Sequence, residues 1–113
     1  MNDNKQLAKQ VARLLGYRII ADCWWEHPEN IDNQIKDYAL EQFIFSCPTT
    51  GLMIEKMERL GWYPYIAHKA VAFGFQYDEG WKTTKHYQYR NRTIHEAIAK
   101  AFVEAKGMIK NEI

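Results

Sequence analysis

The chain has 113 residues, of which 47% are hydrophobic and 14% aromatic, and its formal net charge is +1. This composition excludes a disordered chain and fits one domain, and the small net charge argues against a general polyanion-binding protein. Two cysteines, Cys23 and Cys47, are too few for a disulfide framework or a four-cysteine zinc site, and the absence of a membrane span or signal-peptide start predicts a cytoplasmic protein without membrane contact.

The first half of the chain predicts two helices separated by an acidic segment. Apolar residues at helical spacing predict a helix over 4–15, which Gly16 ends. Residues 22–42 contain six acids and one lysine and predict an irregular connection with a short strand near its end. The apolar run 43–45 predicts the end of a strand, and the helix that follows runs to about Leu60.

The next part of the chain predicts a meander of three strands. The strand-like runs are 62–67, 70–77 and 83–90, and short loops with turn residues connect them. Pro64 lacks a backbone N–H and therefore predicts that the first of these strands either lies at an edge of the sheet or begins late.

A last helix closes the chain. Residues 93–96 fit a capping box, and one apolar face continues from there to Gly107. In chain order, these elements predict a single α+β domain over residues 1–113. An antiparallel meander sheet of three to four strands would pack with about three helices as an α-β-α sandwich.

The sequence contains no established catalytic or metal-binding motif. The four histidines have no metal-ligand spacing, and no glycine-rich phosphate loop is present. Ser46 is the only serine and lacks the setting of a nucleophile elbow. Cys47 fits a helix start, where thiols can be reactive, but no Cys-His-Asn pattern surrounds it and a small buried residue is the commoner role. We therefore expect no enzyme activity, no cofactor and no metal.

Residues 81–95, here named the basic-aromatic segment, combine four cations with aromatic side chains and contain no acid. Arginine binds phosphate through two parallel hydrogen bonds, and a helix N-terminus attracts anions. Aromatic rings stack on bases at roughly 1–3 kcal/mol each. The segment therefore fits a nucleotide, whereas the alternative is an exposed strand with a solvated basic face and core tyrosines. The candidate ligand-binding residues are Lys85, Tyr87, Tyr89, Arg90, Arg92 and Thr93, together with Trp25 from the acidic segment.

Four short motifs occur in an order that resembles a known family. They are Leu14-Leu15-Gly16-Tyr17, Phe45-Ser46-Cys47-Pro48-Thr49-Thr50, Met57-Glu58-Arg59-Leu60-Gly61-Trp62 and Arg92-Thr93-Ile94-His95-Glu96-Ala97-Ile98. In this order they look like the phage ABA sandwich domain of small phage and prophage proteins. A related branch, the Thoeris anti-defence 1 proteins, consists of non-enzymatic oligomeric sponges that bind cyclic ADP-ribose-type signals or cyclic oligonucleotides.

The resemblance implies a phage or prophage protein that sequesters a nucleotide immune signal in the cytoplasm of a bacterial host cell, as a homo-oligomer. Two alternatives stay open. One is an oligomeric phage accessory or structural protein without a small ligand, in which the aromatic residues form core and subunit interface. The other is a nucleic-acid-binding module that uses the basic-aromatic segment, although the acids of 22–42 would repel a long polyanion.

Overall fold

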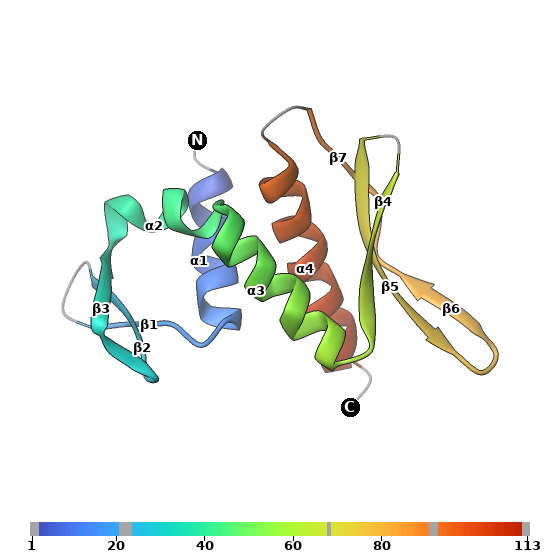
Figure 1. The fold of residues 1–113 in the computed structure, drawn as a ribbon, viewed down its shortest axis with the longest axis horizontal. Coiled ribbons are helices and arrows are strands. Elements are labelled where there is room, and N and C mark those ends of the chain that lie inside the picture. The colour runs from blue at the N-terminus through green and yellow to red at the C-terminus, as the bar shows by residue number, and fades with distance from the viewer. Residues whose placement is uncertain (1–2, 21–23, 68, 91–92, 112–113) are drawn as a thin grey trace.

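Two small antiparallel sheets lie on either side of a layer of helices (Figure 1). The computed structural model describes residues 3–20, 24–67, 69–90 and 93–111. The single α+β domain predicted from the sequence is confirmed. The helices are α1 (Asp3–Leu14), α2 (Asp37–Ile44), α3 (Cys47–Arg59) and α4 (Ile94–Asn111); the first sheet contains β1 (Arg18–Ile19), β2 (Trp24–His27) and β3 (Asn30–Lys36), and the second contains β4 (Trp62–Ala67), β5 (Ala70–Tyr77), β6 (Gly80–Thr83) and β7 (Tyr87–Gln88).

Helix α1 forms and ends as the sequence predicts. Its apolar positions are buried on one face, with Ala8 and Val11 fully enclosed. Gly16 has a φ of 99°, and the backbone N–H of Tyr17 donates to the carbonyl of Ala12 at 2.9 Å. These features close the helix as a Schellman motif, in which glycine takes the left-handed conformation at no steric cost.

The irregular connection predicted for 22–42 is wrong for the part that the structure describes. Residues 24–36 form the hairpin of β2 and β3, and α2 follows immediately. Glu26 illustrates why the acids were misleading: it is only 8% exposed, and its carboxylate lies 3.1 Å from the guanidinium of Arg18 on the neighbouring strand. An acid in the sequence therefore did not mean a solvated loop.

The strand end predicted for 43–45 is also wrong, because Phe43 and Ile44 form the last turn of α2. Leu40 and Ile44 are both buried, and their spacing of four residues places them on one helical face. A run of three apolar residues is too short to distinguish a strand from the end of a short helix.

The second sheet follows the predicted meander, with one break. Strand β4 pairs only with β5 among the described strands, so Pro64 does lie at an edge. The third predicted strand, 83–90, divides into the end of β6 and all of β7. Thr84 explains the division, because its hydroxyl accepts a hydrogen bond from the backbone N–H of Phe73 at 3.0 Å and donates to the carbonyl of Lys85 at 2.9 Å. A side chain thus replaces a backbone partner of β5.

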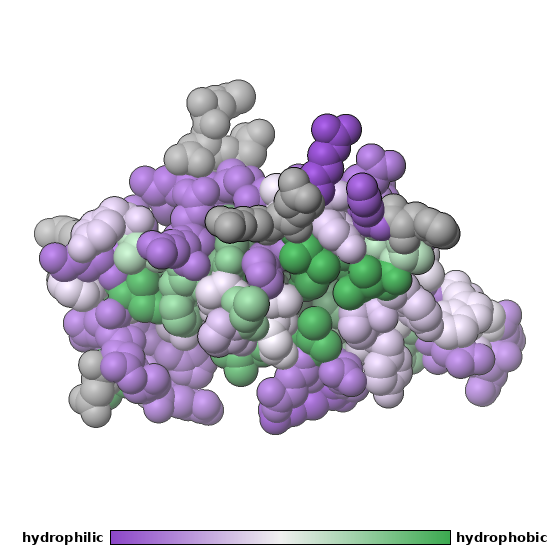
Figure 2. All heavy atoms as spheres, turned by 45° about the horizontal axis from the view of Figure 1, so that its top comes forward, coloured by the Kyte–Doolittle hydropathy of each residue, from purple (hydrophilic) through white to green (hydrophobic). Residues whose placement is uncertain are grey.

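One hydrophobic core joins the helical layer to both sheets. Phe73 on β5 and Phe102 on α4 are fully buried, as are Met53 on α3 and Trp25 on β2. Apolar side chains reach the surface in separate patches between polar ones, as one face of the molecule shows (Figure 2). None of the helices in the described ranges has the length and apolar composition that crossing a membrane requires.

Candidate functional site

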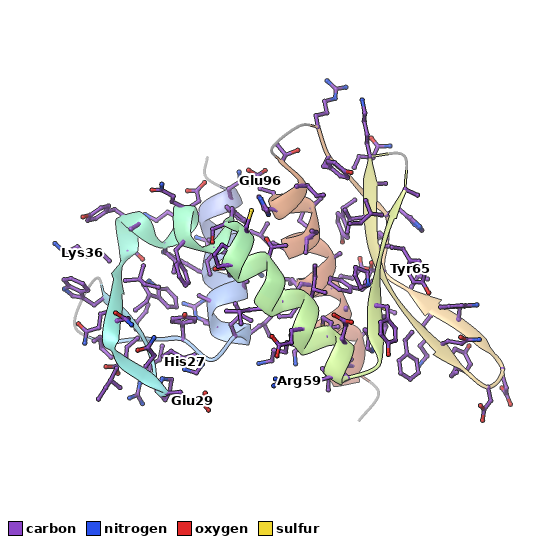
Figure 3. All side chains as sticks on the ribbon, in the orientation of Figure 1. His27, Glu29, Lys36, Arg59, Tyr65 and Glu96 are labelled. Atoms are coloured by element: carbon purple, nitrogen blue, oxygen red, sulfur yellow. The ribbon has the colours of Figure 1, made fainter. Side chains whose placement is uncertain are left out.

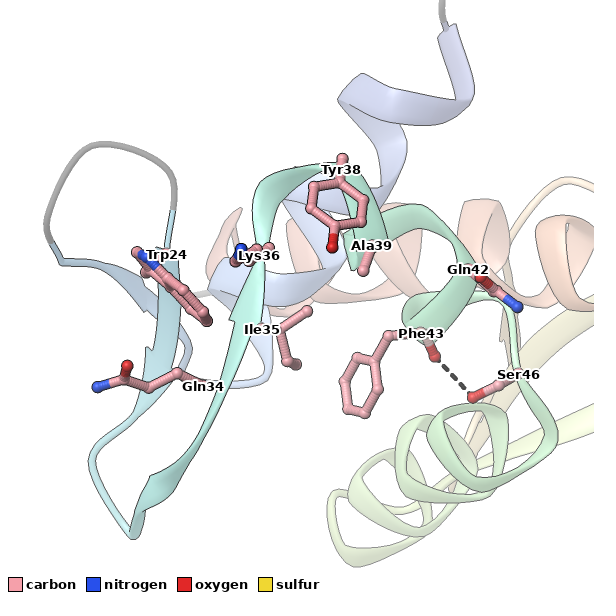
Figure 4. Close-up of a pocket in the computed structure, with 9 residues that line it drawn as sticks. All are labelled: Trp24, Gln34, Ile35, Lys36, Tyr38, Ala39, Gln42, Phe43 and Ser46. Carbon is pink, nitrogen blue, oxygen red and sulfur yellow. Dashed lines mark hydrogen bonds between the residues drawn. The ribbon is translucent and has the colours of Figure 1, made fainter.

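A hollow of about 550 Å³ opens beside the first sheet, between β2, β3 and α2 (Figure 4). This volume lies within the range of roughly 300–1,000 Å³ that is typical of small-molecule sites. We name it the aromatic groove. Nine residues line it: Trp24, Gln34, Ile35, Lys36, Tyr38, Ala39, Gln42, Phe43 and Ser46.

The aromatic groove holds one cation against two rings. The ammonium nitrogen of Lys36 lies 5.1 Å from the ring centroid of Trp24 and 5.8 Å from that of Tyr38. Both distances are within the range of cation–π attraction. No lining residue is acidic, and Tyr38 is 81% exposed. The groove therefore offers a positive charge and accessible ring surface to a ligand.

Amide and hydroxyl groups complete the lining. Gln34 donates to the carboxylate of Glu26 at 3.5 Å, which leaves its amide oxygen to accept. The hydroxyl of Ser46 donates to the carbonyl of Phe43 at 2.6 Å, shown as a dashed line in Figure 4. Because its proton is used there, Ser46 presents lone pairs rather than a donor.

Trp25, the residue after Trp24 in β2, does not line the groove and is fully buried. Its indole N–H donates to Asp37 at 3.0 Å, and this hydrogen bond, with the nearby charges of Lys9 and Lys5, holds the pKa of Asp37 below its ordinary value. The guanidinium of Arg13 lies 5.5 Å from the indole centroid. Trp25 was a sequence candidate for stacking, but the structure places its ring in the core, and its neighbour Trp24 is the ring at the groove.

An acidic residue of α4 forms hydrogen bonds with the basic-aromatic segment. Glu104 on α4 accepts a hydrogen bond from the hydroxyl of Tyr87 at 2.8 Å and another from the backbone N–H of Lys85 at 2.6 Å. Burial, followed by this hydrogen bond and the carboxylate charge, raises the pKa of Tyr87 to about 12. Tyr89 is half-buried and packs against the core. The two tyrosine candidates, Tyr87 and Tyr89, thus contact other parts of the protein.

The remaining candidates lie near the start of α4. Arg90 and Thr93 are exposed, and the Thr93 hydroxyl accepts from the backbone N–H of Arg90 at 2.8 Å and donates to its carbonyl at 2.9 Å. Arg92 lies outside the described residues. Neither the aromatic groove nor the hollows of about 270, 300 and 210 Å³ that described residues line elsewhere include a residue of 81–95.

Three side chains from distant parts of the sequence meet where α3 and α4 begin. The sulfur of Cys47 lies 3.7 Å from Nε2 of His95, and the hydroxyl oxygen of Thr50 lies 2.8 Å from Nδ1 of the same ring. Sequence reasoning missed this cluster because His95 is 48 residues from Cys47. The spacing of three between Cys47 and Thr50 was the only local signal, since it places both on one side of a helical turn.

His27 has a structural role instead. Its Nδ1 accepts from the backbone N–H of Glu29 at 3.1 Å, so Nε2 carries the proton and donates to the carbonyl of Leu15 at 3.1 Å. The ring thereby ties β2 to the end of α1, beside a hollow of about 270 Å³. Among the described residues, no three His, Cys, Asp or Glu side chains are grouped so that they could hold a metal ion.

The outer face of the second sheet carries exposed rings. Tyr63, Tyr65 and Trp81 are 51%, 41% and 54% exposed, and the rings of Tyr65 and Trp81 meet edge to face at 5.7 Å. Gly74 lies under Tyr65, where an added Cβ would come within 2.5 Å of the ring. We name these three rings the outer aromatic face. Tyr65 and Lys36 lie at opposite ends of the molecule (Figure 3).

Comparison with models of protein families, with curated proteins and with solved structures finds no match to this chain. The resemblance to the phage ABA sandwich domain therefore stays a prediction. Function has to be argued from the geometry of the sites themselves.

Proposed function

We propose that the protein is a non-catalytic module that binds and sequesters a nucleotide-type small molecule in the aromatic groove. The observation that carries this proposal is the ammonium of Lys36, held against the rings of Trp24 and Tyr38 in a hollow without acids. A nucleotide combines a planar base with an anionic phosphate. The groove matches that combination with two rings and one cation.

Each lining group has a role in this proposal. The base stacks on Trp24 or Tyr38, which contributes roughly 1–3 kcal/mol per stacked ring. Lys36 pairs with a phosphate, and the amides of Gln34 and Gln42 hydrogen-bond to the base edge. In the setting implied by the sequence resemblance, the ligand is a cyclic ADP-ribose-type signal or a cyclic oligonucleotide. Its sequestration would counteract bacterial anti-phage defence.

Titration calorimetry tests the proposal with cyclic ADP-ribose isomers, cyclic dinucleotides and uncharged adenosine. We expect an anionic nucleotide to bind and Lys36→Gln to weaken it at least about tenfold, which corresponds to about 1.4 kcal/mol. Trp24→Ala should weaken it similarly. Lys85→Gln is the matched control in the basic-aromatic segment and should stay within about twofold of the parent, because no groove residue is changed.

Three outcomes would contradict the proposal. If none of these compounds gives a heat of binding, the protein does not bind a nucleotide-type small molecule. A loss of affinity with Lys85→Gln but not with Lys36→Gln would move the site to the basic-aromatic segment. Ligand recovered in altered form after heat denaturation of the complex would indicate an enzyme rather than a sponge.

A second candidate function, an oligomeric accessory protein, is favoured by the outer aromatic face. Exposed rings on one face of a sheet are typical of surfaces that associate, because aromatic residues are enriched in interfaces. Light scattering of the parent and of Trp81→Lys tests this candidate. A stable oligomer that dissociates in the variant, together with no nucleotide binding, would favour it over the sponge.

A further inference from the structure

The cluster at the start of α3 and α4 has the parts of an activated thiol. Cys47 is exposed, and its sulfur lies 3.7 Å from Nε2 of His95. The other ring nitrogen of His95 lies 2.8 Å from the hydroxyl of Thr50, which is only 7% exposed. A nucleophile beside a base, with the base oriented by a third group, is the general signature of nucleophilic chemistry. We propose that Cys47 is a reactive thiol that exchanges with low-molecular-weight disulfides, with His95 as its base.

The hydrogen bonds of His95 suit both states of such a reaction. When Nδ1–H donates to the Thr50 hydroxyl, Nε2 presents its lone pair to the thiol of Cys47. After the proton moves to Nε2, both ring nitrogens are donors: Nδ1–H still donates to Thr50, and Nε2–H donates to the sulfur. Thr50 is thus a positioning residue, because its hydroxyl keeps the ring aligned before and after the transfer.

The start of α3 adds a favourable field. Cys47 is the first residue of this helix, and the preceding Ser46 makes no side-chain cap hydrogen bond. The backbone N–H groups of the first turn therefore lack a side-chain cap from that residue, and their partial positive charge stabilises negative charge on the sulfur. Pro48 has no N–H to contribute.

A role in core packing does not explain the cysteine at position 47. A small buried residue was the commoner expectation for this cysteine, but its side chain is exposed. The competing explanation is that the Thr50–His95 hydrogen bond only joins α3 to α4 and that Cys47 is a bystander. The two explanations differ in the rate at which the thiol reacts.

The proposed step is a thiol–disulfide exchange. The thiol proton of Cys47 passes to Nε2 of His95 as the sulfur attacks one sulfur of a disulfide R–S–S–R. The Sγ–S bond forms while the S–S bond of the small molecule breaks. The leaving thiolate takes the proton back from Nε2 and departs as R–SH. Cys47 ends as a mixed disulfide, and one sulfur of the co-reactant is reduced to a thiol.

The experiment uses the full chain with Cys23→Ser, so that Cys47 is the only thiol, and glutathione disulfide as the probe. Intact-mass spectrometry follows the mixed disulfide with time. We expect His95→Gln to slow its formation at least about tenfold, since general-base assistance is typically worth that much or more. Thr50→Val should slow it less, and Thr50→Ser, which retains the hydroxyl, should react like the parent. The same substitution at the exposed His86, His86→Gln, is the matched control and should leave the rate unchanged.

An equal rate in the parent and in a folded His95→Gln variant would overturn the proposal. Circular dichroism establishes whether that variant folds. If it does not fold, the test uses the parent protein alone. The rate at which Cys47 forms the mixed disulfide is then compared between the folded protein and the protein unfolded in urea. We expect the folded thiol to react several-fold faster, and an equal or slower reaction would overturn the proposal. The inference is independent of the proposed function, because no nucleotide enters the experiment.

Discussion

Two regions of this molecule combine cations with aromatic rings, and they differ in the acids that packing brings to them. In the aromatic groove, Lys36 faces two rings, and no lining residue is an acid. In the basic-aromatic segment, which has no acid in its own sequence, Glu104 from α4 binds both Tyr87 and the backbone of Lys85. Local sequence charge therefore does not measure the local field, because packing supplies charges from distant residues.

The two regions also differ in how their rings are held. The groove keeps Trp24 and Tyr38 at its surface, while the buried Trp25 donates a hydrogen bond to Asp37. The tyrosines of the segment turn inward, toward α4 and the core. A ring that already has its partners within the protein contributes to stability rather than to binding. This distinction leads to predictions of decreasing size.

The largest expected effect belongs to Trp25→Ala. Truncating a fully buried tryptophan typically costs about 3–5 kcal/mol, because it removes apolar contacts and leaves a cavity. Trp24→Ala, at the adjacent half-buried position, should cost no more than about 1 kcal/mol. Urea denaturation measures both. Equal losses of stability would break the distinction between a structural and an accessible tryptophan.

The next largest effect is expected for Asp37, which accepts the hydrogen bond from the indole of Trp25. Asp37→Ala leaves the indole N–H without its acceptor and should cost about 1–3 kcal/mol, whereas Asp37→Asn retains an acceptor oxygen and should cost less. The folded pKa of Asp37 is lowered, so its charge stabilises the fold above the ordinary carboxyl pKa, and this stability is lost as the pH falls through the folded value. The parent and Asp37→Asn should therefore converge in acid. A constant difference between them from neutral pH into acid would contradict this account.

Sequence patterns predicted the elements whose signal is local. Apolar spacing located α1, α3 and α4, a strand-like run located β4, and alternation located β5. The first sheet was missed because its strands are short and its acids are neutralised in space, as when Glu26 pairs with Arg18 eight residues away. Thr84 similarly divided a predicted strand through a hydrogen bond to Phe73, which no local pattern encodes.

The candidate sites were predicted less well, for the same physical reason. Trp24 and Lys36 are twelve positions apart in the sequence and become neighbours only when β2 pairs with β3. The cluster of Cys47 with His95 needs α3 and α4 to start side by side. In both cases the residues were visible in the sequence, but their proximity depends on packing between elements.

A smaller effect is expected where the basic-aromatic segment meets α4. Tyr87→Phe removes the hydrogen bond to Glu104 and should cost about 0.5–1.5 kcal/mol. The pKa of Tyr87 is raised to about 12, so its protonated form stabilises the fold below the ordinary tyrosine pKa, and that stability is lost as the pH rises through the folded value. Ultraviolet titration of the parent should show a late-ionising phenol that is missing from Tyr87→Phe. Identical titration curves would mean that Glu104 and burial do not hold this hydroxyl.

The smallest effect is expected for Thr93→Ala. Thr93 is exposed, and its hydroxyl bonds only to the backbone of Arg90 among the described residues, where water can replace it. The stability should change by no more than about 0.5 kcal/mol, and nucleotide affinity should stay within about twofold of the parent. Lys36→Gln, measured in the same titrations, provides the contrast. If Thr93→Ala instead abolished binding while Lys36→Gln did not, the start of α4 would be the ligand site.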